Sequence, residues 1–332
     1  MTTTITVAGG GSWGTALAHL MACAGHSPCL WLRDATLAET CNRRHENPRY
    51  LPGFPLHEAL IATTDPAALA ASIVILAIPC QNLRSWLTAY KTYFQKGAVF
   101  CNAAKGLEIQ SLNVCSQIVS QTLPSLAPRY AVLSGPSFAK EVLQGLPTAV
   151  VLAAEDVSLS RQLRDLFSTS VFRFYSSSDV IGVEMGGALK NVMAIAAGVC
   201  DGLGLGHNSR ASLVTRGLAE MRRLGVACGA QPGTFMGLSG LGDLTLTCTG
   251  DLSRNRQVGL RLGHGEKLTH IIQSLGSVAE GVATTKAAHN LAKQLGVEAP
   301  LTEAVYQILY NQREAKTVLQ DLMARRLRDE DV

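Results

Sequence analysis

The chain has 332 residues, of which 47% are hydrophobic and 16% charged, and its formal net charge at pH 7 is +4. This length accommodates about two domains with sizeable buried cores. A positive charge this small and this dispersed does not suit a nucleic-acid-binding protein, so we expect no nucleic-acid partner.

The cysteines and the apolar runs indicate the compartment. Nine cysteines form no CxxC pair, and several fall in predicted core strands, which favours reduced thiols over a disulfide framework. The N-terminus lacks the basic and apolar regions of a signal peptide, and no uncharged apolar run reaches the roughly 18 residues that span a bilayer. We therefore expect a cytoplasmic protein with no membrane insertion.

The first predicted strand, Ile5–Ala8, runs into the sequence GGGSWG and then a helix over residues 15–24. This is the GxGxxG pattern in its strand–turn–helix context. Gly9 permits the tight turn, Gly11 lets a pyrophosphate approach the backbone, and Gly14 brings helix and strand together. The free N–H groups at the helix start suit phosphate. The pattern predicts dinucleotide binding, although a glycine-rich turn without a ligand is the alternative.

A second predicted strand, 29–32, is followed by Arg33 and Asp34. An acidic residue at this point binds the ribose 2′-OH of NAD, whereas an arginine accommodates the 2′-phosphate of NADP. Both are present, so the preference stays open. Because Arg33 comes first, we expect NADPH to be preferred and NADH to be possible, and Arg33→Ala to weaken NADPH more than NADH.

The strand–helix alternation continues and then gives way to helices. Further strands are predicted at 73–77, 98–102, 130–133, 149–152 and 171–175. Loops at the carboxyl ends of such strands line ligand crevices, which makes Lys105 and the turn 135–139 candidates, although Lys105 alone could be a solvated loop residue. After Asp179 the pattern is helical, with segments at 213–224, 254–262, 282–295 and 302–309.

This division predicts an α/β Rossmann-type N-terminal domain with a mostly parallel, doubly wound sheet, followed by an all-α C-terminal domain. We place the boundary between a cofactor domain, 1–180, and a domain for substrate binding and association, 181–332.

Residues 182–198, GVEMGGALKNVMAIAAG, are small and apolar apart from a few polar positions. As a helix, this segment places Glu184 and Asn191 on one face and Lys190 on a neighbouring line. Such a lysine either extends to water or is held in a site, and the segment alone does not decide between the two.

Three later turns carry charges among glycines or at helix starts. Asp243 ends the glycine-dense run 237–243, and Glu280 lies in the turn 277–281. Ser253 is a predicted N-cap, and the helix start with Arg254 suits a phosphate, although an ordinary cap with solvated arginines is also open. The eight histidines show no metal-ligand spacing, so we expect no metal.

Together these motifs resemble the bacterial NAD(P)-dependent glycerol-3-phosphate dehydrogenases, in order and over nearly the whole chain. The matching segments are GGGSWGTALA (9–18), AAKGLE (103–108), SGPSFAKE (134–141), EMGGALKNVMAIAAG (184–198), GLSGLGDLTLTC (237–248), SRNRQVG (253–259) and VAEGV (278–282). Gly10 departs from the commoner alanine and leaves the turn intact. The resemblance also implies a helical domain like that of 6-phosphogluconate dehydrogenase.

The resemblance implies reversible reduction of dihydroxyacetone phosphate to sn-glycerol 3-phosphate, which supplies glycerophospholipid synthesis. It implies that Lys190 is the catalytic lysine. The implied substrate-binding residues are Lys105, Gly135, Ser137, Lys190, Asp243, Ser253, Arg254 and Asn255. The implied cofactor contacts, with the glycine turn, are Gly9, Gly11, Ser12, Trp13, Gly14, Arg33, Lys105, Ala139, Arg254, Val278 and Glu280.

The reduction of a ketone by hydride requires certain groups, and we assign these residues to them. A ketone that accepts hydride becomes an alkoxide, which needs a proton and nearby positive charge. We expect Lys190 to be the general acid/base, with Lys105 holding and polarising the carbonyl and Arg254 holding the phosphate. Burial and the second lysine lower the Lys190 pKa while Asp243 raises it, and the sequence does not settle which effect wins.

Other interpretations remain. The same architecture serves 3-hydroxyacid, 6-phosphogluconate and ketopantoate dehydrogenases, whose substrates need a carboxylate site. From another class, the chain could be a non-catalytic dinucleotide-sensing module, which would not need a buried lysine. We expect a homodimer, because a helical second domain commonly serves association.

Overall fold

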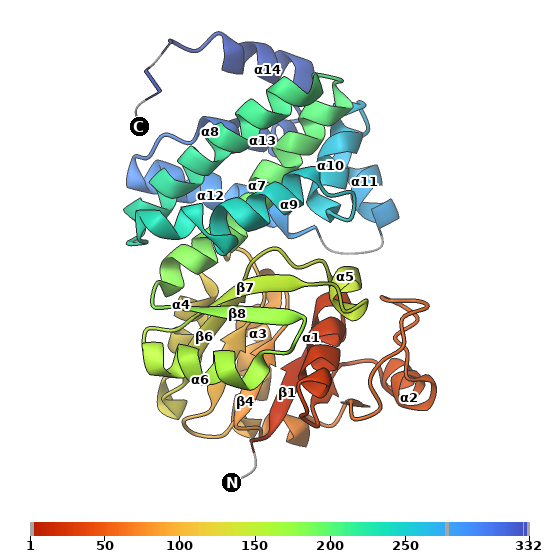
Figure 1. The fold of residues 1–332 in the computed structure, drawn as a ribbon. Coiled ribbons are helices and arrows are strands. Elements are labelled where there is room, and N and C mark those ends of the chain that lie inside the picture. The colour runs from red at the N-terminus through yellow and green to blue at the C-terminus, as the bar shows by residue number, and fades with distance from the viewer. Residues whose placement is uncertain (1–2, 276–278, 328, 331–332) are drawn as a thin grey trace. The chain divides into compact units, whose positions relative to one another are not determined.

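The first half of the chain alternates strands and helices in the computed structural model, which describes residues 3–275, 279–327 and 329–330. The sheet has the order β3-β2-β1-β4-β5-β6-β7-β8. Figure 1 shows this sheet, with β1, β4, β6, β7 and β8 labelled. All neighbouring strands are parallel except β6 and β7, which are antiparallel. Its strands are β1 Ile5–Ala8, β2 Cys29–Trp31, β3 Ile61–Thr63, β4 Ile73–Leu76, β5 Val99–Asn102, β6 Arg129–Ser134, β7 Thr148–Ala153 and β8 Phe172–Ser177.

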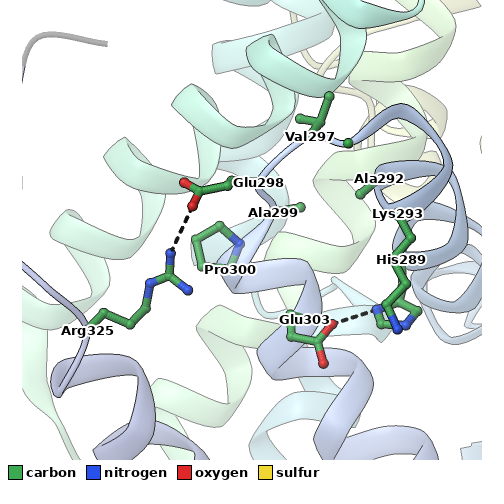
Figure 2. A pocket seen from close by; sticks show the side chains of 10 residues that line it. His289, Ala292, Lys293, Val297, Glu298, Ala299, Pro300, Glu303 and Arg325 are labelled. Atoms are coloured by element: carbon green, nitrogen blue, oxygen red, sulfur yellow. Dashed lines mark ion pairs between the residues drawn. The ribbon is translucent and has the colours of Figure 1, made fainter.

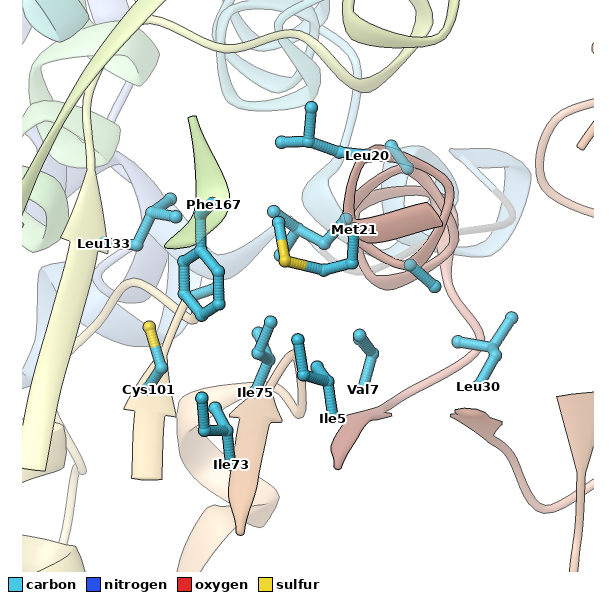
Figure 3. Packing of buried hydrophobic residues seen from close by; sticks show 14 of the residues in the cluster. Ile5, Val7, Leu20, Met21, Leu30, Ile73, Ile75, Cys101, Leu133 and Phe167 are labelled. Carbon is cyan, nitrogen blue, oxygen red and sulfur yellow. The ribbon is translucent and has the colours of Figure 1, made fainter. Parts of the chain in front are cut away.

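The alternation of side chains along the central strands builds a core on each face of the sheet. Ile73 and Ile75 of β4 enter one apolar cluster, whereas Val74 and Leu76 enter the other, as the two-residue period of a strand requires. Helices α1 Ser12–Cys23, α2 Ala35–Arg44, α5 Ala139–Leu143 and α6 Val157–Phe167 cover the first face, and α3 Cys80–Tyr90 and α4 Cys115–Thr122 the second. Figure 3 shows the first cluster, with Phe167 and Met21 packed over Ile75.

The second half consists of helices, apart from short turns, in the part of the chain that the structure describes. They are α7 Val180–Gly202, α8 Gly206–Ala227, α9 Asp243–Thr249, α10 Arg254–Gly263, α11 Leu268–Leu275, α12 Glu280–Leu295, α13 Pro300–Tyr310 and α14 Ala315–Met323. One apolar cluster joins them. The predicted fold class, a doubly wound sheet followed by a helical region, is confirmed.

By their contacts, the residues divide into two compact units. The sheet unit comprises Met1–Ala104 and Cys115–Val180, and the helical unit comprises Lys105–Val114 and Ile181–Val332. The segment with Lys105 thus belongs to the helical unit, although it precedes α4 in sequence. A division of labour between residues 1–180 and 181–332 stays a prediction.

Helix α7 is apolar and long enough to cross a membrane, but 89% of its most apolar window is buried inside the protein. It therefore serves as a core helix. It crosses α10 at a close approach that glycines permit: a Cβ on Gly198 or on Gly259 would overlap backbone of the other helix. One turn further on, a Cβ on either Gly202 or Gly263 would lie 2.9 Å from the other's Cα. This crossing fixes where the start of α10 lies relative to Lys190.

Candidate active site

The glycine turn of the sheet unit has the geometry that its sequence predicts. Gly9 has φ +121°, and a Cβ there would lie 2.5 Å from the carbonyl oxygen of Ala77. A Cβ on Gly14 would overlap the backbone of Gly9, whereas Gly11 faces open space. Helix α1 starts at Ser12 without a side-chain cap, so its first N–H groups are available to an anion. This turn fits the pyrophosphate of a dinucleotide.

A loop packs against this turn in a way that sequence reasoning missed. Asn47 is fully buried, and its Nδ2 donates to the carbonyl of Gly10 at 3.0 Å and to Thr15 Oγ1 at 2.8 Å. Ser12 Oγ donates to the carbonyl of Tyr50 at 3.3 Å. These hydrogen bonds join residues that lie more than 30 positions apart in sequence, so the sequence of the loop alone does not predict them.

The charged residues that follow β2 are not equivalent. Asp34 caps α2 by accepting the N–H of Leu37 at 3.0 Å, and its other oxygen pairs with Arg49 Nη1 at 2.7 Å. The Leu37 N–H, followed by Arg49, lowers the pKa of this carboxyl. Arg33 is exposed. Both carboxylate oxygens of Asp34 therefore have partners within the protein, whereas the Arg33 side chain is exposed to solvent.

The remaining predicted residues of the sheet unit lie at the end of β6. Gly135 has φ +150°, and a Cβ there would lie 2.9 Å from Val150 Cα. Ser137 Oγ donates to the carbonyl of Gly135 at 3.0 Å. Ala139 begins α5 and packs against the core. Trp13, on the first turn of α1, also packs there, and its indole Nε1 is buried without a partner among the described residues.

Three predicted residues meet in the helical unit around one carboxylate. Lys190 Nζ, on α7, donates to Asp243 Oδ1 at 2.5 Å, and Lys105 Nζ donates to Asp243 Oδ2 at 2.6 Å. The carboxylate is 1% exposed, and the side chains of Lys190 and Lys105 are 9% and 14% exposed. Asp243 is brought there by the π-helical turn Leu238–Gly242 that leads into α9, a local geometry often found at functional sites.

Thr247 completes this lysine cluster and was not predicted. It lies one helical turn after Asp243, and its Oγ1 donates to the Asp243 carbonyl at 2.6 Å. The same oxygen accepts from Lys190 Nζ at 2.7 Å. Two of the ammonium's three protons therefore have fixed acceptors, which orients the amine. The four-residue spacing in GDLTLTC was the available signal.

Burial sets the charge state of the cluster. It is the main cause that lowers the pKa of Lys190 to about 8; Lys105 lowers it further, and Asp243 partly opposes. Burial alone would raise the pKa of Asp243, but the charges of Lys105 and Lys190 outweigh it and lower that pKa. At Lys190, burial and the second lysine together outweigh the opposing effect of Asp243 on the pKa. The Lys190 amine can exchange a proton near neutral pH.

The two arginines at the start of α10 have different surroundings. Ser253 caps the helix by accepting the N–H of Arg256 at 3.2 Å. Arg256 is held by Asp201, with an Nη2–Oδ2 distance of 2.7 Å, and by Asp251. Arg254 is exposed and has no ion-pair partner within the described ranges. Arg254 is therefore the arginine that can take an external anion.

Asn255, predicted to bind substrate, joins three helices. Its Nδ2 donates to Asn191 Oδ1 on α7 at 2.9 Å, and its Oδ1 accepts the N–H of Gly281 on α12 at 3.0 Å. Glu280 is the first residue of α12. Val278, a predicted cofactor contact, lies outside the described residues.

A separate pocket of about 230 Å³ lies in the helical unit, between α12, α13 and Arg325 (Figure 2). His289 Nδ1 pairs with Glu303 at 2.8 Å, and Arg325 approaches Glu298 at 3.9 Å. None of the predicted site residues lines this pocket. Among the described residues, no group of three or more histidine, cysteine or acidic side chains could hold a metal ion.

Comparison with known proteins decides the family. Residues 4–160 match the family described as NAD-dependent glycerol-3-phosphate dehydrogenase N-terminus, and residues 179–320 match the corresponding C-terminus. The chain is 69% identical to glycerol-3-phosphate dehydrogenase [NAD(P)+] of Desulfovibrio desulfuricans, over 98% of both chains. It belongs to the NAD-dependent glycerol-3-phosphate dehydrogenase family.

Solved structures match the chain more closely in a glycerol-3-phosphate dehydrogenase than in a ketopantoate reductase. The crystal structure of glycerol-3-phosphate dehydrogenase from Coxiella burnetii matches with a TM-score of 0.92 and 38% identity, covering 97% of this chain and 99% of that one. A ketopantoate reductase from Ralstonia eutropha matches with a TM-score of 0.56 and 14% identity, over 96% and 99%. The second likeness shows a shared fold alone. The resemblance to the glycerol-3-phosphate dehydrogenase family is thereby confirmed.

Proposed function

We propose that the chain is an sn-glycerol-3-phosphate dehydrogenase that reversibly reduces dihydroxyacetone phosphate with NAD(P)H, preferring NADPH. The observation that carries the proposal is the buried cluster of Lys190, Asp243, Lys105 and Thr247. A non-catalytic dinucleotide sensor has no use for a buried amine whose pKa is lowered to about 8.

The cluster supplies what ketone reduction needs. When bound, a nicotinamide dinucleotide would supply the hydride for the carbonyl carbon. Lys190 transfers one proton from Nζ to the carbonyl oxygen, so that the developing alkoxide becomes the product hydroxyl and the amine is left neutral. Lys105 stabilises the developing negative charge on that oxygen through its hydrogen-bonding amine group. Oxidation of the alcohol reverses both transfers.

The phosphate of the substrate needs charge-assisted donors. Arg254 and the N–H groups at the start of α10 that Ser253 does not cap provide them. Arg254 is exposed, and no acidic side chain among the described residues pairs with it. A carboxylate substrate such as ketopantoate lacks this dianionic group. This is the feature of the chain's own residues that favours a phosphorylated ketone.

The cofactor residues of the sheet unit support the dinucleotide half of the proposal. The turn Gly9–Gly14 with the uncapped start of α1 fits a pyrophosphate. We assign Ser12, Trp13, Arg33 and Ala139 to the same cofactor. We further propose a cytoplasmic homodimer that supplies glycerophospholipid synthesis. The burial of α7 supports the part of this proposal that concerns the membrane, because it leaves that helix a core role.

Oxidation of NADPH, followed at 340 nm, tests the proposal directly. Dihydroxyacetone phosphate, ketopantoate and a blank without substrate form the three arms. We expect loss of absorbance with the triose phosphate only. Turnover of ketopantoate, or none with either ketone, would contradict the proposed substrate, and the reverse reaction with sn-glycerol 3-phosphate provides the matching check.

A further inference from the structure

The ion pair between Asp34 and Arg49 bears on cofactor choice. An acidic group after β2 is the usual acceptor for the ribose 2′-OH, and the same charge repels a 2′-phosphate. Here each Asp34 oxygen already has a partner: Oδ1 accepts the N–H of Leu37 and Oδ2 pairs with Arg49 at 2.7 Å. The pair is partly exposed, with side-chain exposures of 34% for Asp34 and 56% for Arg49.

The loop that carries Arg49 is fixed against the glycine turn. Asn47, two residues earlier, is buried and bonded to Gly10 and Thr15. Tyr50, the next residue, accepts a hydrogen bond from Ser12 through its carbonyl. Arg49 therefore lies on a loop anchored on both sides to the turn that fits the pyrophosphate, and its reach to Asp34 is built into the sheet unit.

We propose that Arg49 is a specificity residue for the cofactor: by holding and neutralising Asp34, it leaves Arg33 to bind the 2′-phosphate of NADPH. The inference rests on the proposed dinucleotide-binding function. The side chains of Arg33, Asp34 and Arg49 together carry a net charge of +1, since two of them are arginines and one is a carboxylate. A phosphate gains from that charge, whereas a ribose hydroxyl needs a free carboxylate that Asp34 does not offer.

Arg49 differs from Arg33 in how it acts. Arg33 is exposed and has no hydrogen-bonded or ion-pair partner in the part of the chain that the structure describes, so it is free to contact the phosphate. Arg49 acts through Asp34. Its loss should therefore matter only while position 34 is negative, and an asparagine at 34 preserves the α2 cap because its amide oxygen also accepts the Leu37 N–H.

The test is titration calorimetry of the full chain with two nucleotides that differ only at the 2′ position, adenosine 5′-monophosphate and adenosine 2′,5′-bisphosphate. The variants are Arg49→Ala, Arg49→Lys, Arg33→Ala, and Arg49→Ala and Arg33→Ala each combined with Asp34→Asn. We expect Arg49→Ala to weaken the bisphosphate about five- to tenfold, as partly exposed charges allow, with the monophosphate within about twofold. Arg49→Lys should retain most of the affinity.

The double variants test whether Arg49 acts through the charge of Asp34. Asp34→Asn should restore bisphosphate binding in the Arg49→Ala background to within about threefold of wild type, but not in the Arg33→Ala background. Equal weakening of both nucleotides by Arg49→Ala, no weakening, or failed rescue by Asp34→Asn would each overturn the proposal. Because no ketone is present, these outcomes are separate from failure to reduce dihydroxyacetone phosphate. A wild-type protein that binds neither nucleotide would overturn this proposal together with the dinucleotide site.

Discussion

Lys190 and Asp243, 53 residues apart in sequence, share a buried hydrogen bond of 2.5 Å. The opposite oxygen of that carboxylate holds Lys105, so one negative charge lies between two ammonium groups. When both lysines are protonated the cluster carries one excess positive charge, and it becomes neutral when Lys190 loses its proton. Burial favours loss of the Lys190 proton, which leaves this cluster neutral.

The pH dependence should follow from that charge balance. In the proposed mechanism reduction requires the Lys190 ammonium, so kcat/KM for dihydroxyacetone phosphate should fall as pH rises through the Lys190 pKa of about 8. Oxidation of sn-glycerol 3-phosphate requires the neutral amine, and its kcat/KM should rise over the same range. Initial rates in both directions between about pH 6 and 10 measure this, and parallel profiles in the two directions would contradict the assignment.

Asp243→Asn should move this profile. Asp243 raises the pKa of Lys190, so its replacement by a neutral amide should lower that pKa further and shift the limb for reduction to lower pH. Because the change also leaves buried charge unpaired, kcat should fall and the free energy of unfolding should drop by about 3–5 kcal/mol. Rate profiles and chemical denaturation measure the two effects. A shift of the limb to higher pH would contradict this account of the cluster.

Thr247 should act through the orientation of Lys190. Thr247→Val removes the oxygen that accepts from the ammonium, and a hydrogen bond to a charged group is worth about 1.5–3 kcal/mol, so kcat should fall about 10- to 100-fold. Thr247→Ser keeps the hydroxyl and should retain most of the activity. Near-normal kcat of Thr247→Val, or equal impairment of the serine and valine variants, would show that the hydroxyl is not what orients Lys190.

Arg254 and Arg256 form a matched pair two residues apart. Arg254→Ala should raise KM for dihydroxyacetone phosphate about 10- to 100-fold, because it removes a charged hydrogen bond to phosphate, while the melting temperature stays near that of wild type. Arg256→Ala should instead lower the melting temperature. It removes one of the two arginines that pair with Asp201, whose side chain is 13% exposed, and leaves only Arg210. Steady-state kinetics and thermal unfolding of both variants distinguish the two roles. A raised KM for Arg256→Ala together with a lowered melting temperature for Arg254→Ala would contradict this assignment.

The glycine crossing of α7 and α10 should be costly to fill. A Cβ on Gly259 would overlap the backbone at Ile195, so Gly259→Ala should destabilise the protein by about 1–3 kcal/mol or more. Gly233→Ala is the control, because a Cβ there meets nothing within 4 Å. Denaturant midpoints of both variants provide the measurement. Equal stabilities would show that the helices separate without penalty.

Local sequence patterns predict the start of the fold well. The run Ile5–Ala8 and the glycines after it are constrained by one strand–turn–helix unit, and the structure has that unit. Strand β3 was missed because it has only three residues and Ile61 is 60% exposed. Helix α7 continues past Gly198 to Gly202, since these glycines pack against α10 instead of ending the helix.

The candidate site depends more on tertiary contacts. Lys190 and Asp243 are recognisable from the family motifs, but their direct pairing is not a local property and no spacing predicts it. The separation of Arg254 from Arg256 depends on Asp201, which comes from the end of α7. The engagement of Asp34 depends on a loop whose position is set by Asn47. Residue type indicated which charged side chains could bind a ligand. Only the fold determined which of them already pair with another side chain of the protein.

In the proposed mechanism, Lys190 donates the proton for reduction and accepts it for oxidation. The most direct measurement is the kcat of Lys190→Met for dihydroxyacetone phosphate reduction, with NADPH affinity determined on the same protein by fluorescence titration. Methionine fills the buried space without a charge, and kcat should fall about 10²- to 10⁴-fold while NADPH binds as before. Near-normal turnover of this variant, with NADPH bound, would contradict the account.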